Sequence, residues 1–175
     1  MIVWDKLTLD TYNFLESKDS SGTEETAEFF ASSYHTAMKS SADPMMNTVM
    51  INPKSILKSA WLTVFATMLA SPKDLKSVPY NIIGAAMIAF WTGVTVSPLI
   101  PHPGAVTGTI NVVVFPGNPA SVGIGIYEAF QKQESRKVAD ALVAVYKDHV
   151  KGITGLFTGI TPAPSPIVVP WTGLN

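Results

Sequence analysis

A long stretch without charge constrains this chain more than any other feature of its sequence. From Ser77 to Tyr127, a run of 51 residues, there is no Asp, Glu, Lys or Arg, and none occurs in the 24 residues from Gly152 to Asn175. The surface of a free domain ordinarily carries roughly 25–35% charged residues. Two environments suit uncharged stretches of this length: a lipid membrane, or burial under other protein.

Prolines argue against a membrane as the environment of both stretches. Asn81–Ile100 supplies 20 uncharged residues, the length that spans a bilayer. Pro98 lies near its end, however, and the proline-rich segments beyond it would leave backbone groups that lipid cannot satisfy. Burial among protein subunits accounts for all the uncharged segments. The alternative is a small membrane-associated protein with a helical hairpin at 55–100.

The composition is that of one domain without nucleic-acid or disulfide chemistry. The chain has 175 residues, 14% of them charged against a usual ~25%, and its net charge of −1 gives no basic surface for nucleic acid. Cysteine is absent, which excludes disulfides and thiolate metal sites. The first residues lack a basic segment followed by an apolar run, so we expect no signal peptide. We expect one helical domain over 1–157 and an extended arm over 158–175.

Hydrophobic periodicity predicts a mainly α fold, α+β at the margin, with about five to six helices. Apolar residues recur at helical spacing over 4–17, 24–39, 54–71, 80–96, 121–131 and 134–151. Asp43-Pro44 predicts the start of a further helical piece. We expect Trp61 and Trp91, which lie on apolar stripes, to belong to the core.

A proline-rich loop and strand insertion is expected at 97–121. Five prolines exclude a long helix there, and the β-branched run Thr109–Phe115 predicts one small β element near 108–116. The proline-rich C-terminus predicts an extended arm. Such an arm can add a strand to a neighbour, so we expect another chain to complete the β element.

The polar residues do not form a recognisable catalytic constellation. Glu24, Glu28 and His35 share a helix face, but acidic residues at a helix N-terminus are typical of a solvated, dipole-favoured end. His149 lies on an apolar helix face, which is typical of a core or interface histidine. We therefore expect a protein that is not an enzyme, with no catalytic, cofactor or metal site and no small-molecule substrate.

Three segments carry a resemblance to a known class of protein. They are "YNIIGAAMIAFWTGV" at 80–94, "DHVKGITGLFTGITP" at 148–162 and "PAPSPIVVPWTGLN" at 162–175. Together, over roughly residues 80 to 175, they resemble small virion proteins of bacteriophages with contractile tails. The resemblance implies a structural subunit of a tail, baseplate or neck, assembled in the host cytoplasm into the virion. Its partners would be other virion proteins or copies of itself.

We expect the neighbours to be contacted through the charge-free 77–127 block and the arm. Charge depletion with aromatic residues retained is typical of interface cores, and proline-stiffened segments lose little entropy on docking. The residues expected to bind a partner are Pro166, Ile167, Val169, Pro170 and Trp171 in the arm, and Val112, Val114 and Phe115 in the strand. Trp171 is expected to fill a pocket of the neighbour.

Overall fold

The fold is known from a computed structural model of the whole chain. It describes residues 4–17, 22–39, 46–49, 54–70, 76–92, 95–98, 104–105, 107–114, 118–163 and 165–171. At 39, 46–49, 95–98, 110–114 and 171 the description covers the backbone alone.

Helices come first along the chain and the longer strands come last. The helices are α1 (Trp4–Glu16), α2 (Thr23–Lys39), α3 (Ser55–Ala70), the 3-10 turn η1 (Val78–Tyr80), α4 (Asn81–Trp91), α5 (Pro119–Phe130) and α6 (Ser135–Lys151). The strands are β1 (Met46–Val49), β2 (Thr95–Pro98), β3 (Thr107–Val114), β4 (Thr154–Ile160) and β5 (Pro166–Trp171). The mainly helical class expected from periodicity is confirmed.

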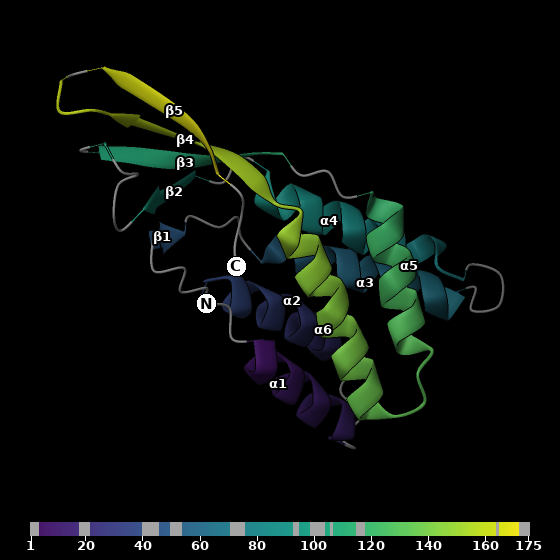
Figure 1. The fold of residues 1–175 in the computed structure, drawn as a ribbon. Helices are drawn as coiled ribbons and strands as arrows, with labels where there is room; N and C mark the ends of the chain where they lie inside the picture. Colours follow the sequence, from purple (N-terminus) through teal and green to yellow (C-terminus); the bar gives the residue numbers. More distant parts are fainter. Residues whose placement is uncertain are drawn as a thin grey trace.

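The six α-helices form a closed ring of neighbours. Each helix packs against the next one along the chain, and α6 returns to pack against α1 (Figure 1). The seam between α1 and α2 has the fewest close approaches of backbone. The bundle therefore has one loosely joined side, and the groove described below lies there.

Local sequence explains where several helices begin. The Asn118 side chain accepts a hydrogen bond from Ala120 N–H at 3.0 Å, and Pro119 occupies the first turn, where its missing N–H costs nothing. Glu24 and Glu25 lie in the first turn of α2, where the helix dipole favours acidic side chains.

An aromatic series runs through the core from α1 to α5. Phe14 stacks on Phe29 with ring centroids 3.8 Å apart, and Phe29 meets the edge of Phe30 at 5.4 Å. Phe30 then stacks on Trp61 at 4.7 Å, and both contact Phe130. These five rings come from α1, α2, α3 and α5, so they join four helices of the bundle.

Tyr34 joins three helices at the centre of the core. Its hydroxyl accepts a hydrogen bond from Trp91 Nε1 at 2.9 Å, and its ring meets the edges of Phe90 and Tyr146. Burial raises the pKa of Tyr34 and of Tyr146 above the ordinary tyrosine value. Trp61 and Trp91 are 2% and 1% exposed, as expected of core residues.

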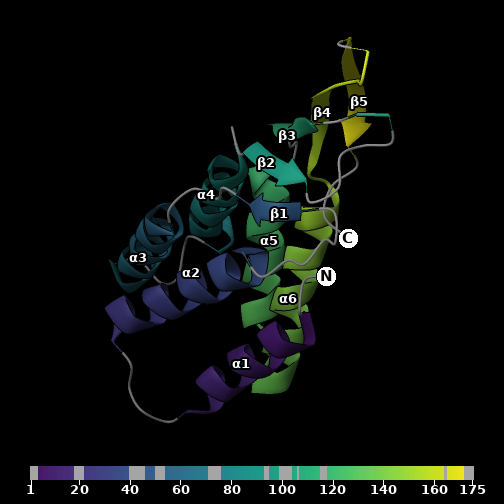
Figure 2. The ribbon, with the colours of Figure 1, turned by 90° about the vertical axis from the view of Figure 1, so that its left-hand side faces the viewer.

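The five strands form one antiparallel sheet in the order β1-β2-β3-β4-β5. It projects from one end of the bundle, where α6 leads into β4, and the β4–β5 hairpin extends farthest from the helices (Figures 1 and 2). The expected β element near 108–116 is present as β3. The sheet is larger than expected, because four further strands pair with it or with one another.

Two sequence expectations are corrected by the sheet. The helical piece expected after Pro44 is wrong, since strand β1 occupies Met46–Val49. The β element is also completed by the chain itself, because β4 pairs along β3. The C-terminal segment is extended, as expected, and its strand β5 pairs with β4 of the same chain.

Candidate interaction surfaces

The sheet carries no charge in any of its strands. None of the residues of β1 to β5 is Asp, Glu, Lys or Arg. The charged residues that the structure describes lie on the helices and the loops between them. In both views the hairpin of β4 and β5 extends past the ends of the helices (Figures 1 and 2). The hairpin that projects from the molecule is therefore uncharged.

One face of the β4–β5 hairpin is apolar and open to solvent. Strand β4 alternates between exposed and buried residues along its whole length. Its outward-facing residues Leu156 and Ile160 are 40% and 53% exposed, and Val168, opposite Thr158 on β5, is 59% exposed. Prolines 166 and 170 pair with Ile160 and Leu156 on the same face. We call this surface, made by residues 156, 158, 160, 166, 168 and 170, the outer hairpin face.

The opposite face of the hairpin is closed by Phe157. A Cβ atom at Gly108 would stand 2.2 Å from the Phe157 ring, and one at Gly159 would stand 2.7 Å from it. Gly108 and Gly159 are paired across β3 and β4, so the ring covers a cross-strand pair that lacks side chains. Ile167 and Val169 on β5 share this face and pack against the core. The inner face belongs to the chain's own interior.

The five predicted partner residues of the C-terminal segment divide between the two faces. Pro166 and Pro170 are exposed on the outer hairpin face. Ile167 and Val169 are half-buried on the inner face, so their contacts are largely with their own chain. Trp171 ends β5 opposite Gly155, and its side chain lies outside the description.

The three predicted partner residues of the central strand are only partly placed. Val112 pairs with Gly155 and Val114 pairs with Thr154, which puts both on β3 of the same sheet. Their side chains lie outside the description, and Phe115 lies outside the described residues.

Sequence reasoning missed the residues that contribute most to the outer hairpin face. Leu156, Ile160 and Val168 are absent from the predicted set. For the two residues of β4 the signal was present in TGLFTGI at 154–160, where threonine or an aliphatic residue alternates with glycine or phenylalanine. Three of those seven positions are glycine or phenylalanine on the buried side, so both faces appear apolar and the strand pattern is obscured.

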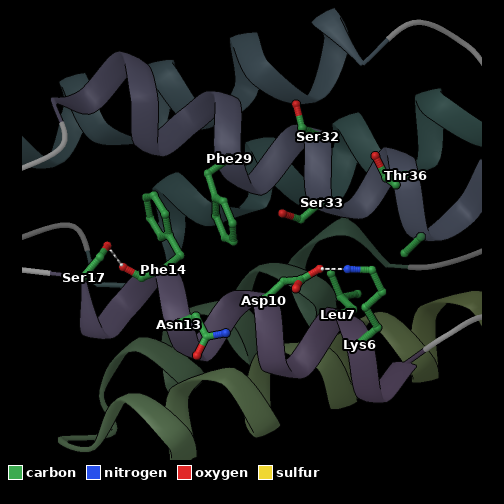
Figure 3. Close-up of a pocket in the computed structure, with 11 residues that line it drawn as sticks. Lys6, Leu7, Asp10, Asn13, Phe14, Ser17, Phe29, Ser32, Ser33 and Thr36 are labelled. Atoms are coloured by element: carbon green, nitrogen blue, oxygen red, sulfur yellow. Dashed lines mark hydrogen bonds and ion pairs between the residues drawn. The ribbon is translucent and has the colours of Figure 1, made fainter.

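A groove opens at the loose seam between α1 and α2. It is a cavity of about 550 Å³, and Figure 3 shows the side chains that line it. The lining residues are Lys6, Leu7, Asp10, Asn13, Phe14, Ser17, Phe29, Ser32, Ser33, Thr36 and Ala37. The stacked rings of Phe14 and Phe29 stand at one end, and a salt bridge of 2.9 Å between Lys6 and Asp10 at the other. Among the described residues of the lining, the one carboxylate is thus already paired with Lys6, and hydroxyl and amide groups make up the rest of the polar lining.

The acidic face predicted on α2 is an ion-pair network. Lys58 Nζ lies 2.5 Å from the carboxylate of Glu24 and 3.2 Å from that of Glu28. Lys54 forms a second ion pair with Glu28, and the Ser32 hydroxyl donates a hydrogen bond of 2.8 Å to the same carboxylate. Hydrogen bonds from Lys54, then Ser32 and Lys58, lower the pKa of Glu28 to about 2. The network connects α2 to the start of α3, and its exposed pairs contribute little to stability.

The structure places two of the three histidines, His35 and His149. His35 lies on α2 with its ring 5.9 Å from that of Phe90. His149 is 9% exposed on α6, and its Nε2 has no hydrogen-bond partner. Burial lowers the pKa of His149 to about 4, as suits the core histidine expected there. Within the described part of the chain, no group of three His, Cys, Asp or Glu side chains could hold a metal ion.

In comparisons with known proteins, no family model, no curated protein and no solved structure matches the chain. Among the described residues, no helix has both the length and the apolar character to cross a bilayer.

Proposed function

We propose that the chain is a non-enzymatic structural subunit of a large protein assembly, of the kind found in the tail, baseplate or neck of a contractile-tailed phage. It binds other virion proteins, or copies of itself, through the outer hairpin face. The observation that carries the proposal is the uncharged, projecting sheet with Leu156, Ile160 and Val168 exposed on one side. The sequence resemblance supplies the kind of assembly.

Burial removes part of the 77–127 block from the partner-contact surface that the sequence predicts. Much of the 77–127 block lies inside the chain's own bundle, since Ile83, Phe90, Trp91 and Ile126 are each at most 1% exposed. That part of the uncharged block is already covered by its own chain, so its lack of charge does not require a partner. Residues of the block that do face solvent on helices include Val78 and Ile124, which are 62% and 45% exposed. The strands of the sheet are uncharged throughout.

The energetics of the outer hairpin face suit a contact made in many copies. Fully burying a Leu, Ile or Val side chain is worth about 1.5–3 kcal/mol. Three partly exposed side chains therefore provide a few kcal/mol, and association costs at least about 4 kcal/mol. A stable interface also needs about 800 Å² from each partner. The hairpin face is thus one part of a larger contact, as expected of a subunit held by several neighbours.

The sheet architecture itself favours coverage by another surface. Antiparallel sheets that stand free usually alternate apolar and polar residues, with the polar side in water. In this hairpin the inner face is covered by Phe157 and the core, while the outer face presents apolar residues and threonine. Exposed contiguous apolar patches of this kind mark interaction sites.

The proposal is tested by placing a charge on the outer hairpin face. Val168→Lys changes a side chain that is 59% exposed, so the isolated chain should fold as before. A lysine there would have to be desolvated in the contact, and the variant should be lost from the assembled particle. The measurement is the amount of each variant in purified particles, quantified by mass spectrometry against the wild-type chain.

Leu69→Lys is the matched control for this experiment. Leu69 is 74% exposed on α3, away from the sheet, and the substitution likewise replaces an exposed aliphatic side chain with lysine. We expect this variant to enter particles at the wild-type level. Equal incorporation of both lysine variants would show that the outer hairpin face is not a contact surface, and the proposal would then be wrong.

A further inference from the structure

Strand β5 is an edge of the sheet. It pairs with β4 on one side, and no strand that the structure describes lies on its other side. An open edge presents unpaired N–H and C=O groups, which form a template for another strand. Because β5 is uncharged and contains Ile167, Val168 and Val169, its composition would favour uncontrolled pairing.

The register of the hairpin determines which backbone groups face the open edge. Thr161 N–H donates to Ser165 C=O at 3.0 Å, which makes these two residues a hydrogen-bonded pair. Paired residues alternate between hydrogen-bonded and non-hydrogen-bonded along an antiparallel ladder. Counting from that pair, Ile167 and Val169 direct their backbone groups toward β4. The backbone groups of Pro166, Val168 and Pro170 point toward the open edge.

Two of these three outward positions are proline. Proline has no backbone N–H, so the open edge of β5 keeps the carbonyl oxygens of Pro166, Val168 and Pro170 but only the N–H of Val168. Both prolines thus stand where a missing donor leaves the pairing with β4 intact. A strand added to this edge would find a donor at one position in three.

The effect is largest for pairing with a second copy of the chain. If two β5 strands met in antiparallel fashion about Val168, Pro166 of one copy would stand opposite Pro170 of the other at both ends. Neither residue of such a pair can donate a hydrogen bond. Only the central pair could exchange its two hydrogen bonds, which is too few to hold two strands together.

We propose that Pro166 and Pro170 close the β5 edge, so that the sheet ends at the C-terminal hairpin and does not grow by strand addition there. This inference does not depend on the proposed function. It also replaces the sequence expectation that the C-terminal segment adds a strand to a neighbour. What the hairpin leaves for contact with another chain is its outer face.

The double substitution Pro166→Val and Pro170→Val tests the proposal. It restores two outward N–H groups at exposed positions and raises the strand propensity of β5. The variant should self-associate roughly tenfold more tightly or more, measured by sedimentation equilibrium over a concentration series. Pro162→Val, in the loop between the strands, makes the same chemical change without opening the edge and should behave as the wild type.

A measurement on the wild-type chain keeps the test independent of how the variants fold. The N–H of Val168 faces the open edge, so it should exchange with deuterium much faster than those of Ile167 and Val169 at every protein concentration. Circular dichroism on the variants checks that the helices persist. Concentration-dependent protection of Val168 in the wild type would contradict the closed edge, as would a double variant that associates no more tightly than the wild type.

Discussion

The ring of Phe157 on β4 lies where a side chain at Gly108 on β3 would have to be. A Cβ atom built at Gly108 would stand 2.2 Å from Cζ of the ring and 2.8 Å from the backbone oxygen of Thr158. Contacts below 3.0 Å force atoms to move, and the backbone oxygen cannot move without disturbing the ladder. The absence of a side chain at Gly108 thus lets β3, β4 and Phe157 fit together near the β4–β5 turn.

Gly108→Ala should destabilise the chain by about 1–3 kcal/mol, because it overpacks a position with no space for a methyl group. Thermal unfolding followed by circular dichroism measures the effect. Gly22→Ala is the control, since a Cβ atom there meets nothing within 4 Å. A Gly108→Ala variant as stable as Gly22→Ala would contradict the close packing of Phe157.

Gly84→Ala should also lower stability, despite the better helix propensity of alanine. A Cβ atom at Gly84 of α4 would stand 2.3 Å from the backbone oxygen of Pro119 on α5, so the two helices would have to separate. A loss of roughly 1–3 kcal/mol is expected from overpacking. Gly125→Ala gains the same propensity, but its Cβ meets the movable side chain of Val145, so its loss should be smaller. Urea denaturation measures the stability of the two variants. A larger loss of stability for Gly125→Ala than for Gly84→Ala would contradict the tight α4–α5 contact.

Tyr34→Phe should cost about 1–3 kcal/mol. It removes the hydroxyl that accepts from Trp91 Nε1 and leaves a buried indole N–H without a partner. The measurement is the free energy of unfolding in urea. Tyr12→Phe, at a half-buried tyrosine of α1, is the matched control and should change that energy by less than about 0.5 kcal/mol. Similar losses for both variants would mean that the buried hydrogen bond adds nothing.

Stability should fall as the pH drops from about 6.5 to about 4. Burial lowers the pKa of His149 from 6.5 to about 4, so in this window the unfolded chain binds a proton that the folded chain excludes. The contribution of neutral His149 to the free energy of unfolding is complete above pH 6.5, and at most about 3 kcal/mol of it is lost by pH 4. The pKa of Glu28 is lowered from 4.5 to about 2, so the stability that this carboxylate provides is lost only as the pH falls below 4.5.

The substitution His149→Leu distinguishes the contribution of His149 to the pH dependence of stability from that of Glu28. The variant should lose the slope of unfolding free energy between pH 6.5 and 4.5 and keep the decline below pH 4.5. Urea denaturation at a series of pH values measures both parts. An unchanged slope in the upper window would show that another group binds the proton on unfolding.

Helices were predictable because their signal is local. The stripes on residues 24–39 and 134–151 repeat every three to four positions, and α2 and α6 occupy almost the same ranges. The buried positions of Trp61, Trp91 and His149 followed from the apolar stripes on 54–71, 80–96 and 134–151. Each of these inferences needs only residues within a few turns of one another.

The sheet was mostly not predictable, because its strands are short and their partners are distant in sequence. Only β3 has a long β-branched run, and β1 is four residues long and pairs with β2 across two helices. Strand β4 was hidden by its glycines. The packing of the Phe157 ring against Gly159 of β4 and Gly108 of β3 is a contact between strands that local sequence does not show. The prolines of β5 suggested a free arm, whereas the register shows that they tolerate pairing with β4.

The central claim is that the outer hairpin face is covered in an assembled particle. Hydroxyl-radical footprinting of Leu156, Ile160 and Val168, in the isolated chain and in the particle, tests it most directly. Leu9, 49% exposed on α1, serves as an internal reference. The account predicts that the reactivity of the three hairpin residues falls severalfold on assembly while that of Leu9 changes less. Unchanged reactivity at all three hairpin residues in the particle would contradict it.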